Sequence, residues 1–188
     1  MKKYQFLRKY FNDLLAKIVP DEIMLGNLVT IADLLIEVNQ NGKKCLIFGN
    51  GGSAAMASHV SVDLTKNARI RCMNFNEADL ITCFSNDYGY DRWVEKAVEF
   101  YADDGDLTIF ISSSGKSRNM LNGVKAAKKL KLKSVITLTG FESDNPLRNS
   151  GDINLWVDSK AYNYVENTHQ IWLLGIVDLI IGNKEYPA

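Results

Sequence analysis

The chain opens with two stretches in which apolar residues recur at helical spacing. This pattern predicts amphipathic helices over residues 3–19 and 22–40. Between them, Pro20 ends the first helix and Asp21 caps the second. We therefore expect residues 1–41 to form a pair of helices ahead of the rest of the fold.

After this helical pair the pattern changes to short apolar runs separated, in most cases, by helical stretches. Each run is bounded by glycine or polar residues, as is typical of strands. The runs cover residues 45–48, 72–75, 107–111, 134–138 and 153–157. Their alternation with helices predicts a doubly wound α/β domain, a parallel sheet covered by helices on both faces.

The last predicted element is a long helix over about residues 162–181. Beyond Gln170 it is apolar on nearly all sides. Such a helix is buried against a sheet or against another subunit. This helix and the apolar stripes of the first two helices present more apolar surface than one small sheet can cover. The sequence therefore predicts a homo-oligomer.

Composition and charge narrow the class of protein. At 188 residues the chain can build one domain, residues 1–188, without disulfides or a structural metal. Its 22 Lys and Arg balance 22 Asp and Glu, which gives no reason to expect nucleic-acid or membrane-surface binding. No secretory signal or bilayer-spanning run is present, and Cys45, Cys72 and Cys83 lack C-x-x-C spacing. We expect a cytoplasmic protein whose cysteines are reduced core residues.

The first strand runs directly into a glycine turn, Gly-Asn-Gly-Gly-Ser at residues 49–53. Ser53 stands where the N-cap of the next helix is expected, and the free amides of a helix start attract anions. The glycines do not follow the dinucleotide or P-loop order, so no nucleotide cofactor is expected. A plain turn without a ligand remains the alternative for this motif alone.

A second strand end carries a cluster of hydroxyls. Residues 112–117, Ser-Ser-Ser-Gly-Lys-Ser, follow the third predicted strand and lead into a predicted helix over residues 118–130. In open α/β sheets a ligand binds outside the carboxyl ends of the strands. Two such ends with serines and helix-start amides can surround one phosphate, although serines there can also serve only as caps and turns.

With both segments in view, the chain resembles the sugar isomerase (SIS) domain family and, within it, the phosphoheptose isomerases. The resemblance rests on residues 49–55, His59, and residues 85–89, 111–117 and 138–140, in the family's order and spacing. It implies a flavodoxin-like fold and a homotetramer with an active site between subunits. It also implies isomerisation of sedoheptulose 7-phosphate to a heptose 7-phosphate, for bacterial surface-polysaccharide synthesis.

The same resemblance implies which residues contact the phosphorylated sugar. These are Asn50, Gly51, Gly52, Ser53, Asn86, Asp87, Ser112, Ser113, Ser114 and Ser117. Residues 86–89 also read as an exposed turn, whose amide and carboxylate can hold sugar hydroxyls.

The chain departs from the family at its metal and acid–base residues. The family has His and, four residues on, Glu, then Gln and, eight residues on, a second His, which together hold zinc. Here those positions carry His59, Asp63, Glu166 and Leu174. Leucine can neither bind a metal nor donate a proton. The other three predict a site for one divalent metal, with a simple hydrogen-bonded cluster as the alternative.

An aldose–ketose isomerisation moves a proton between adjacent carbons and therefore needs a base. Asp63 and Glu166 are the candidates. For His169, the only other histidine, we expect a hydrogen-bonded position in the core. Three functions stay open: the phosphoheptose isomerase itself, an isomerase of a different sugar phosphate, and a non-catalytic phosphosugar-binding module that regulates or contacts another protein.

Overall fold

The computed structural model describes residues 2–185 and contains one parallel sheet. Its five strands lie in the order β2-β1-β3-β4-β5. They are β1 Cys45–Gly49, β2 Cys72–Asn74, β3 Leu107–Ser112, β4 Ser134–Thr139 and β5 Ile153–Trp156. This is the flavodoxin-like order of a doubly wound sheet, so the predicted fold class is confirmed.

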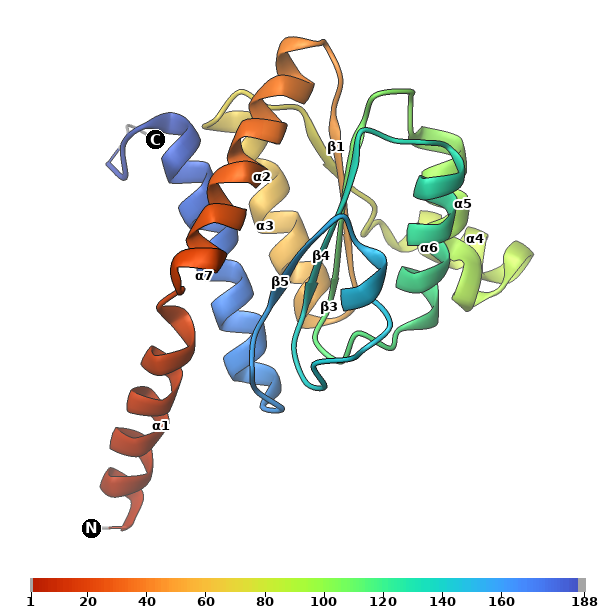
Figure 1. Cartoon of the computed structure of the whole chain (residues 1–188). Coiled ribbons are helices and arrows are strands. Elements are labelled where there is room, and N and C mark those ends of the chain that lie inside the picture. The colour runs from red at the N-terminus through yellow and green to blue at the C-terminus, as the bar shows by residue number, and fades with distance from the viewer. Residues whose placement is uncertain (1, 186–188) are drawn as a thin grey trace.

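Helices cover both faces of the sheet (Figure 1). The helices are α1 Lys2–Ile18, α2 Glu22–Gln40, α3 Gly52–Lys66, α4 Ala78–Tyr88, α5 Trp93–Tyr101, α6 Arg118–Lys129 and α7 Tyr162–Ile181, with short 3-10 turns at Tyr90–Arg92 and Arg148–Ser150. The layer of α2, α3 and α7 packs on one face, and α5 and α6 pack on the other with α4 beside them. None of the helices between residues 2 and 185 is long and apolar enough to span a membrane.

Strand β3 illustrates why the strands read as continuous apolar runs. All of its residues are buried, because it lies in the middle of the sheet between two helical layers. Ile109 and Ile111 join the core under α2, α3 and α7, whereas Phe110 joins the core under α5 and α6. On that second face the ring of Phe110 stacks on Phe48 of β1, 5.3 Å between centroids.

The sheet topology fixes where a ligand can bind. Strand order reverses between β1 and β3, since α3 follows β1 on one face and α6 follows β3 on the other. In register, Gly49 at the end of β1 pairs with Ile111 near the end of β3. The glycine turn and the serine loop therefore begin at the same level, at the switch point of the sheet.

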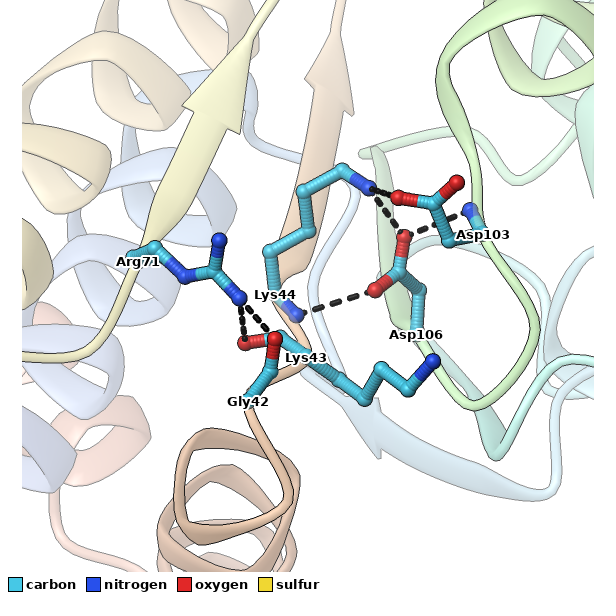
Figure 2. A network of polar contacts seen from close by, with 6 residues as sticks. All are labelled: Gly42, Lys43, Lys44, Arg71, Asp103 and Asp106. Carbon is cyan, nitrogen blue, oxygen red and sulfur yellow. Dashed lines mark hydrogen bonds and ion pairs between the residues drawn. The ribbon is translucent and has the colours of Figure 1, made fainter.

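At the opposite ends of the same two strands, a buried carboxylate ties the chain together (Figure 2). Asp106 accepts hydrogen bonds from the backbone N–H and the ammonium of Lys44, at 2.9 and 2.6 Å. It also accepts the backbone N–H of Asp103 at 2.8 Å. Beside it, the Arg71 guanidinium donates to the carbonyls of Gly42 and Lys43. This network holds the amino ends of β1 and β3 together.

Helix α1 extends away from the sheet, with the N-terminus at its outer end (Figure 1). None of its residues is buried. Two side chains of α7 hold it: the hydroxyl of Tyr164 donates to the carbonyl of Tyr10 at 3.0 Å, and the indole of Trp172 to that of Ile18 at 2.8 Å. Its remaining surface carries exposed apolar side chains.

Two details of the sequence prediction are wrong. Helix α3 is capped at Gly51, whose φ of 55° suits glycine, so Ser53 lies inside the first helical turn and is not the N-cap. Cys45 and Cys72 are buried as expected, but Cys83 is exposed because α4 lies at the outside of the second layer with no buried residue. All three cysteines are free.

Candidate functional site

The glycine turn needs its glycines because the backbone is tightly packed there. A Cβ on Gly49 would lie 2.5 Å from backbone atoms of Ser53. The turn is closed by the N–H of Ser53, which donates to the carbonyl of Asn50 at 3.0 Å. As a result, the amino end of α3 and its positive dipole face the space above the sheet.

The serine loop after β3 is also held in place. Gly115 adopts a φ of 64°, and its carbonyl accepts the N–H of Leu147 at 3.1 Å. The carbonyl of Ser113 accepts the N–H of Gly140, which follows β4. The hydroxyls of Ser112 and Ser117 lie 3.0 Å apart and share a hydrogen bond.

Between the two loops and the start of α7 lies a pocket of about 120 Å³, which we call the serine pocket. It is lined by Asn50, Ser53, Ile111, Ser112, Ser113, Ser114, Ser117, Tyr162 and Glu166. The hydroxyl of Ser113 is buried and has no hydrogen-bond partner among the described residues. Neutral hydroxyls and a helix amino end are suited to bind a phosphate.

Glu166 introduces the one carboxylate into the lining of this pocket. The side chain comes from the second turn of α7 and lies against Gly52, where an added Cβ would overlap the carboxyl group. Burial raises the pKa of Glu166 above its ordinary value. A carboxylate with a raised pKa is a better base near neutral pH.

Asp63 does not line the serine pocket. It belongs to a separate group of hydrogen-bonded side chains on α3 and α7. Its carboxylate is 3.3 Å from Nε2 of His59, one turn earlier on α3. Nδ1 of His59 lies 2.7 Å from the amide nitrogen of Gln170 on α7. The amide nitrogen can only donate, so Nδ1 accepts and Nε2 carries the proton towards Asp63.

These contacts bear on the metal expected at His59, Asp63 and Glu166. Nδ1 of His59 faces the amide of Gln170 and Nε2 faces Asp63, so a metal on this ring would have to displace one of these contacts. Among residues 2–185, no three His, Cys, Asp or Glu side chains are grouped so that they could hold an ion. Leu174 at the fourth position is partly buried in the apolar core. The arrangement does not fit a resident metal, and we derive no chemical step through one.

His169 occupies the core position expected from the sequence. It is fully buried, and its Nε2–H donates to the carbonyl of Thr139 at 3.0 Å. Burial lowers the pKa of His169 to about 4, because a charged ring would lose its hydration there.

We expect this histidine to make the protein less stable in mild acid. An unfolded chain binds its proton near pH 6.5, whereas the folded chain resists until about pH 4. The contribution of His169 to the free energy of unfolding is therefore fully present above pH 6.5. It is lost as the pH drops towards 4, which lowers the free energy of unfolding by about 3 kcal/mol. Urea unfolding at a series of pH values measures this. Between pH 6.5 and 4, the free energy of unfolding should change less with pH in His169→Gln than in the wild type, whereas His59→Gln should keep the wild-type dependence. Equal pH dependence in the two variants would contradict the role given to His169.

Asn86 and Asp87, expected in an exposed turn beside the substrate, lie in the last turn of α4 instead. The helix continues to Tyr88, and Gly89 at φ 88° ends it. The two side chains are exposed and bond to each other at 2.9 Å. Neither lines the serine pocket in a single chain.

Two residues at the site were missed from the sequence. Tyr162, more than half exposed, lines the serine pocket with its ring 4.9 Å from that of Phe141. Gln170 bonds His59 from α7. Gln170 could have been found, because it lies four residues after Glu166 and therefore on the same helical face.

The chain is similar in sequence to known proteins. Residues 8–140 match the family described as SIS domain. A phosphoheptose isomerase of Campylobacter concisus is 36% identical over 152 residues, covering 78% of this chain and 79% of the relative. A probable phosphoheptose isomerase of Thermoplasma acidophilum is 35% identical over 167 residues, covering 85% and 90%.

The fold is likewise similar to solved structures. The phosphoheptose isomerase of Neisseria gonorrhoeae superposes with a TM-score of 0.86 at 27% identity, covering 96% of this chain and 99% of that one. The phosphoheptose isomerase of Francisella tularensis gives a TM-score of 0.85 at 25% identity, covering 97% and 100%. The similarity therefore includes the helices that precede the sheet.

Proposed function

This chain belongs to the SIS domain family and, within it, to the phosphoheptose isomerases, and from that membership we propose that it converts sedoheptulose 7-phosphate to a heptose 7-phosphate. The observation that carries the proposal is the Glu166 carboxylate in the serine pocket, next to hydroxyls that suit a phosphate. The product would serve the synthesis of bacterial surface polysaccharides.

In the proposed complex the serine pocket holds the phosphate. Ser112 at the end of β3 and Ser114 and Ser117 in the loop after it present their hydroxyls, and the amino end of α3 adds its dipole. At about 120 Å³ the pocket holds little more than a phosphate and its first carbons. The rest of the sugar extends along α3 and α7, past Glu166.

The carboxylate of Glu166 acts as the base. It removes a proton from the carbon beside the carbonyl and returns it to the neighbouring carbon, through an enediol. On α3, His59 pairs with Asp63 and contacts Gln170, which lies one helical turn after Glu166 on α7. There the His59–Asp63 pair can exchange protons with the sugar oxygens, so Asp63 is the second catalytic residue.

Turnover tests the proposal directly. The purified protein should convert sedoheptulose 7-phosphate to the aldose, and NMR of the sugar measures this conversion. A panel of shorter ketose phosphates distinguishes the neighbouring possibility, an isomerase of another sugar phosphate. Conversion of a shorter sugar in preference to the heptulose would replace our substrate assignment.

A second candidate is a phosphosugar-binding module without turnover. Leu174 favours it, because the residue at the family's second histidine position can neither donate nor accept a proton. Loss of one proton-transfer group costs about 10²–10⁴-fold in rate. A thermal shift with the sugar phosphate but no conversion would support this candidate over the enzyme.

We further propose that the protein is a homo-oligomer, a tetramer as the family resemblance implies, assembled through residues 1–41. The stripe on α1 supports this proposal: side chains three or four residues apart are each more than half exposed. They are Tyr4, Leu7, Phe11 and Leu15. The three free cysteines fit a reducing compartment, so a cytoplasmic location is part of the proposal.

The oligomer can be broken on α1 alone. The double variant Leu7→Glu, Phe11→Glu places two charges in the stripe, and burying unpaired charges opposes association. Light scattering should give several chain masses for the wild type and one for the variant. The control Asn12→Glu adds a charge to an exposed position of the same helix and should stay assembled. A wild-type monomer would contradict the proposal.

A further inference from the structure

Asn50, in the wall of the serine pocket, is held by a second asparagine. Its Nδ2 donates to Oδ1 of Asn119 at 3.0 Å, and Nδ2 of Asn119 donates back to Oδ1 of Asn50 at 2.9 Å. Asn119 is only 2% exposed and lies in the first turn of α6. The pair thus joins the glycine turn after β1 to the helix after β3.

The direction of this amide pair is fixed by the backbone. Two facing amides could both be turned over without losing either bond. The backbone N–H of Met120, however, points to one atom of the Asn119 amide at 3.1 Å, and because an N–H can only donate, that atom is the oxygen. With Asn119 fixed, the nitrogen of Asn50 must face it.

Tyr90 completes the arrangement. Its hydroxyl donates to Oδ1 of Asn50 at 3.2 Å, so this oxygen accepts one hydrogen bond from Tyr90 and one from Asn119. Tyr90 follows Gly89, the residue that ends α4. The segment after α4 therefore reaches the site through Tyr90 and not through Asn86 or Asp87.

The consequence is that Asn50 has only one group left to offer a ligand. Both lone pairs of its oxygen and one of its two amide protons are used. The second N–H remains, on a residue that lines the serine pocket. An ionised phosphate only accepts hydrogen bonds, so an amide held in this direction favours it, whereas a reversed amide would present an oxygen.

We propose that Asn119, together with Tyr90, is a positioning residue that holds Asn50 as a hydrogen-bond donor to the phosphorylated sugar. The nature of the ligand rests on the proposed function, but the fixed amide does not. A mere connection between two loops would affect stability and leave substrate affinity unchanged, so the two roles differ in what they predict.

Asn119→Asp tests the positioning directly. Aspartate keeps an oxygen for Met120 but loses the N–H that Asn50 accepts, and its second oxygen repels the oxygen of Asn50. We expect KM for the sugar phosphate to rise about tenfold or more, the cost of a lost hydrogen bond to a charged group, with kcat within about threefold. Tyr90→Phe should raise KM less, and in the same sense.

The matched control is Asn122→Asp, one turn further along α6. This amide donates to the carbonyl of Asp91 at 2.9 Å and does not line the serine pocket. It undergoes the same chemical change and should leave KM unchanged. If Asn119→Asp lowers stability or kcat while KM stays at the wild-type value, the positioning role is wrong.

A measurement on the side chain itself separates this inference from the proposed function. Hydrogen exchange of the Asn50 side-chain amide, followed by NMR without ligand, should be slow for one proton in the wild type and faster in Asn119→Ala. Equal rates in both proteins would overturn the inference even if the sugar phosphate is converted. Slow exchange in a protein that neither binds nor converts the sugar would uphold the fixed amide and refute the function.

Discussion

Glu166→Gln is expected to lower kcat for the isomerisation by about 10²–10⁴-fold while the sugar phosphate still binds. The amide has nearly the shape of the carboxyl group, so the serine pocket keeps its form, but it cannot accept a proton from carbon. The raised pKa of Glu166 suits it to act as a base near neutral pH, and the variant removes that property alone. Steady-state kinetics and binding of the sugar phosphate measure the two effects separately.

Gly52→Ala displaces the carboxylate of Glu166 without changing Glu166 itself. Its added methyl group would overlap the carboxyl of Glu166 and force it to move, while alanine is well tolerated in the first turn of α3. We expect a stable protein with reduced kcat. The control Glu22→Gln makes the same chemical change as Glu166→Gln, at an exposed position on α2, and should remain fully active.

Comparison with Asp63→Asn decides between the two carboxylates. Asp63 does not line the serine pocket, and we expect a loss of only about tenfold, since Glu166 would still take the proton from carbon. Full activity in Glu166→Gln with severe loss in Asp63→Asn would transfer the role of base to Asp63.

The second large effect concerns stability. Asp106→Ala is expected to destabilise the fold by about 3–5 kcal/mol, because it leaves the partly buried Lys44 ammonium with only the exposed carboxylate of Asp103. The backbone N–H groups of Lys44 and Asp103 lose their acceptor as well. Urea unfolding followed by circular dichroism measures the free energy of unfolding.

Asp104→Ala is the matched control for that experiment. Asp104 lies two residues earlier, in the same turn, and is exposed. Its removal should change the free energy of unfolding by no more than about 0.5 kcal/mol. If both variants lose the same small amount, the network of Figure 2 does not stabilise the strand ends.

The strands were predictable from sequence because most of them are buried. The predicted limits of β1 and β3 differ from the structure by only one residue, at the carboxyl end. The prediction is this accurate because both strands lie between two helical layers and are therefore unbroken apolar runs. The serine pocket followed from the same pattern, because parallel strands bring their carboxyl ends to one edge of the sheet.

Two kinds of feature could not be predicted from the sequence. One kind is contacts between residues far apart in the chain, and the other is a local sequence that suits two conformations. Asn50 meets Asn119 across 69 positions, and His59 meets Gln170 across 111. The first pairing leaves no pattern in the chain, whereas the spacing of Gln170 from Glu166 only places the two on one helical face. The segment at Asn86 and Asp87 contains polar residues followed by Gly89, a sequence that suits both a turn and the end of a helix. Packing of α4 against α5 accompanies the helical choice.

We propose that the serine pocket and Glu166 together perform an isomerisation. Incubation of the wild-type protein with sedoheptulose 7-phosphate in heavy water tests it most directly, with NMR of the recovered sugar. We expect an aldose 7-phosphate and deuterium at the carbon beside the carbonyl, both suppressed in Glu166→Gln. A sugar phosphate that binds and is recovered unchanged, without deuterium, would contradict it.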